Sequence, residues 1–174
     1  MENNLYDAVC KAKTPRRDKR LWIAAAAAAL IFAVAVAPMV WSAHYQRQYR
    51  LFSTDLADSS LYAQRHGCLV LERGGETFPL KAGSGYDSFL ARIVTAGSGR
   101  TGSAPDQPPA ATISYGNGAT LELWSVHLEG YVSTDREEGL FLRYTYPDGK
   151  TYGYDSERLD LESTLRLLEH SITE

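Results

Sequence analysis

The stretch RRDKRLWIAAAAAALIFAVAVAPMVWSAHY, residues 16–45, decides how the rest of the chain is organised. Its residues 21–43 carry no charge. A run of about 20 apolar residues is typical of a transmembrane helix, because at about 1.5 Å per residue it crosses about 30 Å of hydrocarbon. Trp22 and Trp41 lie near its two ends, roughly 28 Å apart along a helix, where headgroup layers favour tryptophan. The sequence therefore predicts a membrane span over 21–43.

A cleaved signal peptide is the main alternative, and a soluble helix is a third. The apolar region of a signal peptide usually has about 7–15 residues and ends in a small-x-small site. The present run is longer, and its Ala35-Val36-Ala37 site is followed at once by Pro38. Cleavage after Ala43 would place Trp41 where a small side chain is required. We therefore favour an uncleaved signal anchor.

Charge predicts the orientation of this span. Basic flanks of a membrane helix stay in the cytoplasm. The tail 1–20 is basic, whereas only Arg47 and Arg50 follow the span closely. We therefore expect the tail inside and residues 44–174 outside the membrane, in the cell envelope. The expected membrane-interface anchors are Trp22, Trp41, Arg16, Arg17, Lys19 and Arg20.

The composition of the outer part limits its partners. Residues 44–174 hold 12 basic and 18 acidic residues, a net charge of −6, which argues against nucleic-acid binding because that needs a basic face. The expected partners are the lipid bilayer and a protein of the membrane or envelope. Ala25, Ala29, Ala33 and Ala37 have small-xxx-small spacing, which allows a homodimer through the span but also arises by chance in an alanine-rich segment.

The two cysteines and the outer asparagine favour a bacterial protein. Cys10 and Cys68 would lie on opposite sides of the membrane and could not pair. Asn117 precedes Gly-Ala and forms no glycosylation sequon. Cys68 by itself is interpreted as a small buried hydrophobe, with a reactive thiol as the alternative.

The pattern after the span predicts a helical stalk over 44–57 and an α+β domain over 58–174. Three strand pairs with turn residues between them indicate hairpins: 68–72 with 76–81, 111–115 with 119–126, and 140–146 with 150–154. Pro79 indicates that the second strand lies at a sheet edge. The Gly116-Asn117-Gly118 segment suits a type I′ turn.

Two amphipathic helices are predicted. The first covers 85–96, with Ser84 and Asp87 forming a capping box. The second follows an N-cap at Asp155 or Ser156 and presents Leu161, Leu165, Leu168 and Ile172 on one face. The expected order is ββα-ββ(β)ββ-α, with an optional strand between the last two hairpins. One mostly antiparallel sheet covered by the two helices would bury these faces.

Segment 97–110, GSGRTGSAPDQPPA, is predicted to be a flexible loop, with a ligand or partner loop as the alternative. Its Gly97–Gly102 part matches the letters G-x-G-x-x-G. That dinucleotide-binding fingerprint requires a strand before it and a helix after it. Here a predicted helix precedes it and a proline-rich run follows, so the match has no functional meaning.

Four tyrosines alternate along the last hairpin: Tyr144, Tyr146, Tyr152 and Tyr154. Such a stripe is either a binding surface or, more often, a sheet face packed under a helix, here the one that carries Leu165.

No motif indicates catalysis, a cofactor or a metal site. We expect a non-enzymatic, single-pass membrane protein whose outer domain binds a ligand or protein, as an envelope sensor or accessory subunit. The alternatives are a membrane-tethered envelope enzyme, which would need convergent acids or a reactive Cys68, and a structural anchor without a ligand.

Overall fold

The computed structural model describes residues 19–96, 102–127 and 138–172, and for residues 19–22 and 24 it describes the backbone alone. The chain divides into two compact units, Met1–His44 and Tyr45–Glu174. Cys10, Arg16 and Arg17 lie outside the described residues.

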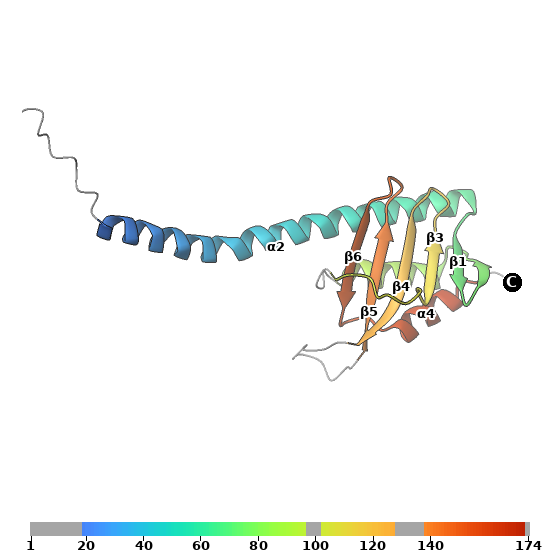
Figure 1. The fold of residues 1–174 in the computed structure, drawn as a ribbon. Coiled ribbons are helices and arrows are strands. Elements are labelled where there is room, and N and C mark those ends of the chain that lie inside the picture. The colour runs from blue at the N-terminus through green and yellow to red at the C-terminus, as the bar shows by residue number, and fades with distance from the viewer. Residues whose placement is uncertain (1–18, 97–101, 128–137, 173–174) are drawn as a thin grey trace, which may run out of the picture. The chain divides into compact units, whose positions relative to one another are not determined.

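The first unit contains the beginning of helix α2 (Lys19–His66), whose 48 residues include Pro38 (Figure 1). Up to His44, most of the apolar side chains of this helix are exposed; Phe32, for example, keeps 70% of its surface and Trp41 keeps 62%. By length and composition this helix can cross a membrane, and none of its most apolar window is buried. A protein core does not account for this apolar segment.

The second unit contains one antiparallel sheet, as expected. Among the described residues its strand order is β2-β1-β3-β4-β5-β6, and every neighbouring pair is antiparallel. The strand β2 that holds Pro79 lies at an edge, as the sequence predicts. The optional extra strand would fall within 128–137, outside the described residues. The strands are β1 (Val70–Arg73), β2 (Glu76–Pro79), β3 (Ala111–Ser114), β4 (Thr120–His127), β5 (Glu138–Thr145) and β6 (Thr151–Ser156).

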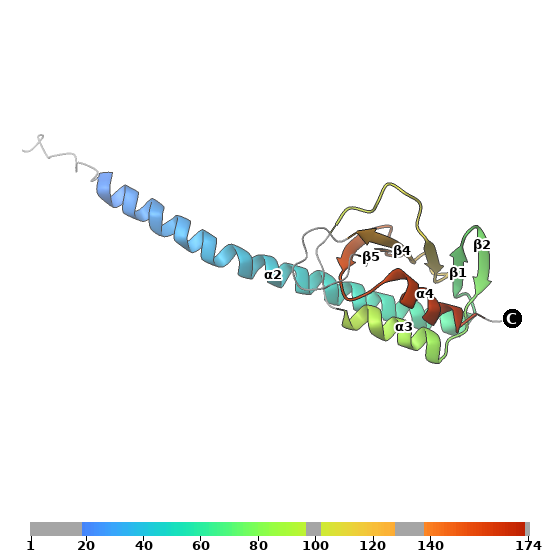
Figure 2. The ribbon, with the colours of Figure 1, turned by 90° about the horizontal axis from the view of Figure 1, so that it is seen from below.

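Helices cover one face of this sheet (Figure 2). The two predicted amphipathic helices are present as α3 (Ser84–Thr95) and α4 (Leu161–Glu169). The part of α2 from Tyr45 onward is a third helix on the same face, and its Phe52 and Leu56 are fully buried. The segment expected as a stalk is therefore helical but also part of the core.

The buried positions of α2 explain this packing. Phe52, Leu56, Ser59, Ser60 and Ala63 follow one another at short helical steps and are all buried. This spacing places them on one face of a helix. The face is mixed in polarity, because it includes the serines at 59 and 60. For that reason the apolar pattern alone did not reveal it.

The helix caps differ from the predicted ones. The N-cap of α3 is Gly83, with no side-chain capping bond, so Ser84 is not a capping residue. The N-cap of α4 is Asp160 and neither Asp155 nor Ser156. Asp155 and Ser156 instead belong to β6 and pair with β5. The strand continues because its backbone groups gain ladder bonds to the neighbouring strand.

The turn between β3 and β4 is not type I′. That turn requires positive φ at both central residues. Gly116 and Gly118 have φ of 72° and 94°, but no described non-glycine residue has a positive φ, so Asn117 does not. The Asn117 side chain supports the turn instead, since its Oδ1 accepts a hydrogen bond of 3.0 Å from the Ala119 amide.

Residues 102–110 cross the sheet face opposite the helices (Figure 1). Trp124 of β4 and Phe141 of β5 point to this side and are almost completely buried. The indole Nε1 of Trp124 donates a hydrogen bond of 2.9 Å to the Gln107 carbonyl. This half of the predicted flexible loop is therefore packed onto the sheet, whereas 97–101 lies outside the described residues.

Candidate functional site

The four alternating tyrosines differ in exposure. Tyr144, Tyr152 and Tyr154 are buried in the core, whereas Tyr146 is half-buried. The helix that covers the three buried rings is α2. The ring centroid of Phe52 lies 5.5, 5.4 and 5.6 Å from those of Tyr144, Tyr152 and Tyr154. Such distances are typical of packed aromatic rings.

Burial keeps these phenols neutral. It raises the pKa of Tyr152 to about 12 and also raises the pKa of Tyr144 and of Tyr154, because a phenolate loses its hydration in the core. Tyr144 is also a hydrogen-bond donor to a carboxylate, which raises its pKa in the same direction. At neutral pH each hydroxyl therefore carries a proton to donate.

A chain of polar side chains runs from the β3–β4 turn to α2. The Nδ2 of Asn117 donates to Ser59 Oγ at 2.9 Å. The Tyr144 hydroxyl lies 2.9 Å from Ser59 Oγ and donates to Asp55 Oδ2 at 2.6 Å. Because Tyr144 has one proton and directs it to Asp55, Ser59 is the donor to Tyr144. Every donor in the chain thus points towards the Asp55 carboxylate, and the network holds that carboxylate in one orientation.

Asp55 also lines an open groove of about 800 Å³ in the second unit. One wall comes from α2 and the other from the β5–β6 hairpin. The groove is large enough for a small ligand or a few residues of a peptide. Its lining residues are Gln48, Leu51, Asp55, Tyr146, Pro147, Asp148, Lys150 and Thr151.

The charges in this groove are not balanced. Lys150 Nζ and Asp148 Oδ2 form an exposed ion pair of 2.6 Å, which raises the pKa of Lys150 and lowers that of Asp148. Among the described residues no basic side chain forms an ion pair with Asp55. The groove therefore has a net negative charge from Asp55. Tyr146 is the one residue of the predicted tyrosine stripe that lines it.

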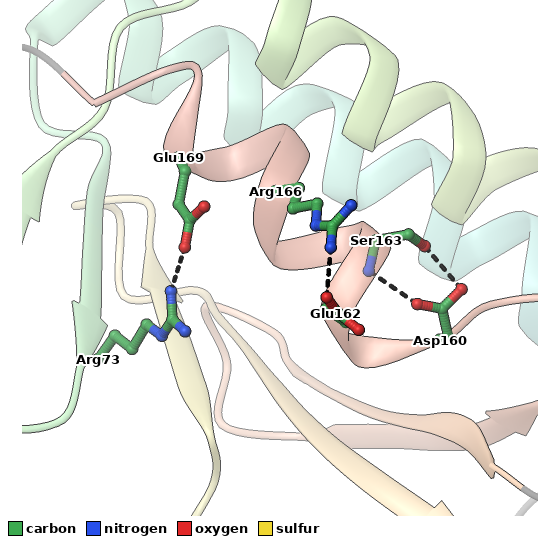
Figure 3. A network of polar contacts seen from close by, with 6 residues as sticks. All are labelled: Arg73, Asp160, Glu162, Ser163, Arg166 and Glu169. Atoms are coloured by element: carbon green, nitrogen blue, oxygen red, sulfur yellow. Dashed lines mark hydrogen bonds and ion pairs between the residues drawn. The ribbon is translucent and has the colours of Figure 1, made fainter.

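The acids around α4 do not form a comparable site, because they are engaged with neighbouring side chains (Figure 3). Both carboxylate oxygens of Asp160 accept bonds of 2.7 Å from Ser163, one from its amide and one from its hydroxyl. Glu162 pairs with Arg166 one turn later, and Glu169 pairs with Arg73 of β1. These contacts cap α4 and link it to the sheet.

Cys68 is half-buried and forms no disulfide. Its Sγ lies 3.3 Å from the Tyr115 carbonyl oxygen, beneath the turn at Gly116. Cys68 thus packs against the core as a small side chain but is only partly buried. Of the predicted membrane-interface anchors, Trp41 is exposed on α2, while the side chains of Lys19, Arg20 and Trp22 lie outside the described residues, as do Arg16 and Arg17.

The described part of the chain contains no group of three His, Cys, Asp or Glu residues that could hold a metal ion. Comparisons with known protein families, with curated proteins and with solved structures return no match for this chain. The groove at Asp55 is therefore the candidate site on geometry alone.

No motif in the sequence indicates Asp55, Ser59 or Asn117 as site residues. They are 4 to 62 positions apart and belong to two elements, a helix and a turn, that only the fold brings together. One signal was available: Asp55, Ser59 and Ala63 recur at i, i+4 and i+8, so one helix face combines polar and small residues.

Proposed function

We propose that the protein is a single-pass, membrane-anchored binding module of the bacterial cell envelope. The N-terminus lies in the cytoplasm, and the α+β domain outside binds a protein partner through the groove at Asp55. The protein acts as a sensor or accessory subunit and has no catalytic activity of its own.

The membrane anchor is the best-supported element of this proposal, and one observation supports it. Four residues in a short stretch of α2, Leu30, Ile31, Phe32 and Val34, each keep 68–70% of their surface exposed. Successive helix residues are about 100° apart, so these four side chains cover more than half of the helix circumference. Val40, which is 62% exposed, lies in the remaining sector, so apolar side chains surround the helix. A helix that is apolar on all sides needs an apolar solvent all round it, as a bilayer provides.

Binding rather than catalysis is supported by the chemistry of the groove. Among the described residues, those that line it include no histidine or cysteine. Lys150 is held protonated by Asp148, so it is a poor base or nucleophile at neutral pH. The remaining carboxylate, Asp55, accepts a hydrogen bond from the Tyr144 hydroxyl. The groove therefore offers fixed charge, an aromatic ring and apolar surface, which are the features of a recognition site.

Cysteine labelling tests the anchor and its orientation. Because Cys68 is half-buried, a variant that combines Cys68→Ala with Thr77→Cys provides an exposed outer reporter, and Cys10 provides the inner one. A membrane-impermeant maleimide should label the thiol introduced at position 77 in intact cells and reach Cys10 only after permeabilisation. Labelling of Cys10 alone would reverse the topology, and release of the protein by alkaline carbonate would exclude the anchor.

Site-specific photo-cross-linking tests the binding role. Leu51 lines the groove and is 53% exposed, while Leu61 on the same helix is 49% exposed and does not line it. A photoreactive residue at 51 should cross-link one defined protein in native membranes, and the same residue at 61 should not. Equal products at both positions would contradict a role of the groove.

A further inference from the structure

We infer that the groove at Asp55 recognises a basic side chain, lysine or arginine, that a partner protein inserts between α2 and the β5–β6 hairpin. This inference rests on the proposed binding function and adds the chemistry of what is bound. It follows from the fixed carboxylate of Asp55, the net negative charge of the groove and its apolar walls.

The carboxylate is preorganised. Asp55 Oδ2 accepts a hydrogen bond of 2.6 Å from the Tyr144 hydroxyl. That hydroxyl is bonded to Ser59 Oγ, which in turn accepts a hydrogen bond from Asn117. A charged group that is already oriented loses little conformational freedom when a ligand binds. Asp55 is half-buried, so its field is screened less than that of a fully exposed acid.

The charge that would balance Asp55 in the groove is positive. Lys150 is committed to Asp148, and no ion pair joins Asp55 to a basic residue in the described part of the chain. Arg47 and Arg50 precede it on the same helix, and neither lines the groove. An ammonium or guanidinium group beside Asp55 would form a charge-assisted hydrogen bond, which is roughly twice as strong as a neutral one.

The walls suit the stem of a basic side chain. Leu51 and Pro147 offer apolar surface, and the Tyr146 ring can lie against a cation or a methylene chain. Gln48 and Thr151 add an amide and a hydroxyl that can bond a peptide backbone. A free alkylamine would use the carboxylate and the apolar walls but has no backbone for Gln48 and Thr151 to bond, whereas a lysine or arginine within a peptide uses all three features.

The experiment measures binding of small probes to the full-length protein in lipid nanodiscs. The probes are N-acetyl-lysine methylamide and N-acetyl-arginine methylamide, with N-acetyl-glutamine methylamide as the neutral control and propylammonium as the free amine. The methyl NMR signals of Leu51 report the groove, and those of Ile113 report the core. The basic probes should shift the Leu51 signals in a saturable manner, and the neutral one should not.

Charge variants assign the effect to Asp55. Asp55→Asn keeps an oxygen that can accept the Tyr144 hydrogen bond but removes the charge, so affinity for the basic probes should fall about tenfold or more. Asp58→Asn, an acid three residues later that does not line the groove, should change nothing. Lys150→Met removes the ion-pair partner of Asp148 on the exposed hairpin and should tighten binding of the basic probes. This variant tests the inference independently of whether Asp55→Asn folds well.

Three results would overturn the inference: equal shifts with basic and neutral probes, unchanged affinity in Asp55→Asn with an unchanged Ile113 signal, or no tightening in Lys150→Met. Propylammonium bound as tightly as the blocked lysine would refute a peptide as the source of the cation. If no probe binds but a photoreactive residue at 51 still cross-links a protein, the binding function stands and the cation site falls.

Discussion

The hydroxyl of Tyr144 on β5 donates a hydrogen bond of 2.6 Å to the carboxylate of Asp55 on α2, a residue 89 positions earlier in the chain. This bond joins the sheet to the helix at the edge of the groove. It fixes the position of the charge that we propose as the recognition element. Contacts of this kind contribute to stability and to binding, and variants of single residues separate the two.

The hydroxyl groups of Tyr144 and Tyr152 should differ in their effect on stability. Tyr144→Phe removes a bond to a charged group and should lower the free energy of unfolding by about 1.5–3 kcal/mol. The Tyr152 hydroxyl is buried and has no hydrogen-bond partner among the described residues. Tyr152→Phe should therefore be neutral or stabilising. Denaturant unfolding of the full-length protein in detergent micelles measures both, and equal losses would refute the distinction.

The ring of Tyr152 should matter even though its hydroxyl does not. Its contact with Phe52 makes Tyr152→Ala a large core truncation, which should cost about 3–5 kcal/mol. The same unfolding measurement tests this value. A folded and equally stable variant would mean that Tyr152 is a surface residue.

The helix after the span should behave as core and not as a stalk. Phe52→Ala removes a fully buried ring and should destabilise the domain by about 3–5 kcal/mol. The neighbouring Leu51 is exposed, so Leu51→Ala should change the free energy of unfolding by about 0.5 kcal/mol or less. Similar values for the two variants would show that this part of α2 does not pack against the sheet.

Substitution of Asp160 should remove a helix cap, whereas substitution of Ser84 should not. Asp160→Ala removes the bonds to the Ser163 amide and hydroxyl and should cost about 0.5–2 kcal/mol. Ser84→Ala should have little effect, because the Ser84 side chain does not cap α3. Thermal unfolding of both variants tests the pair. A larger loss for Ser84→Ala would contradict the observed caps.

Alkaline pH should unfold the domain. The buried tyrosines have pKa values raised above the value of about 10 expected in the unfolded chain, and Tyr152 reaches about 12. Below about pH 10 both states are protonated, so the contribution of these groups is fully present. As pH rises from about 10 through the folded pKa, the unfolded state loses its protons first and stability falls. The tyrosinate absorbance of the buried rings should therefore appear together with the loss of near-ultraviolet circular dichroism, and its appearance while that dichroism is intact would contradict the prediction.

The sequence alone determined the local features of this protein. The uncharged 21–43 run predicts an apolar helix, and period-two alternation with glycine turns predicts the hairpins. Pro79 predicts an edge strand because proline cannot donate to a ladder. Each of these signals depends on neighbouring residues, so no knowledge of distant contacts is needed to interpret it.

Only the tertiary structure decided which helix covers the tyrosines and where the groove lies. Phe52 and Asp55 lie on a helix whose buried face includes serines, so the sequence predicts a polar stalk there. Only the fold shows that Tyr144 is the hydrogen-bond partner of Asp55 and Ser59. The N-cap at Asp160 likewise depended on β6 continuing through Ser156. Contacts between residues far apart in the chain are chosen by packing and hydrogen-bond satisfaction in three dimensions, which local periodicity does not encode.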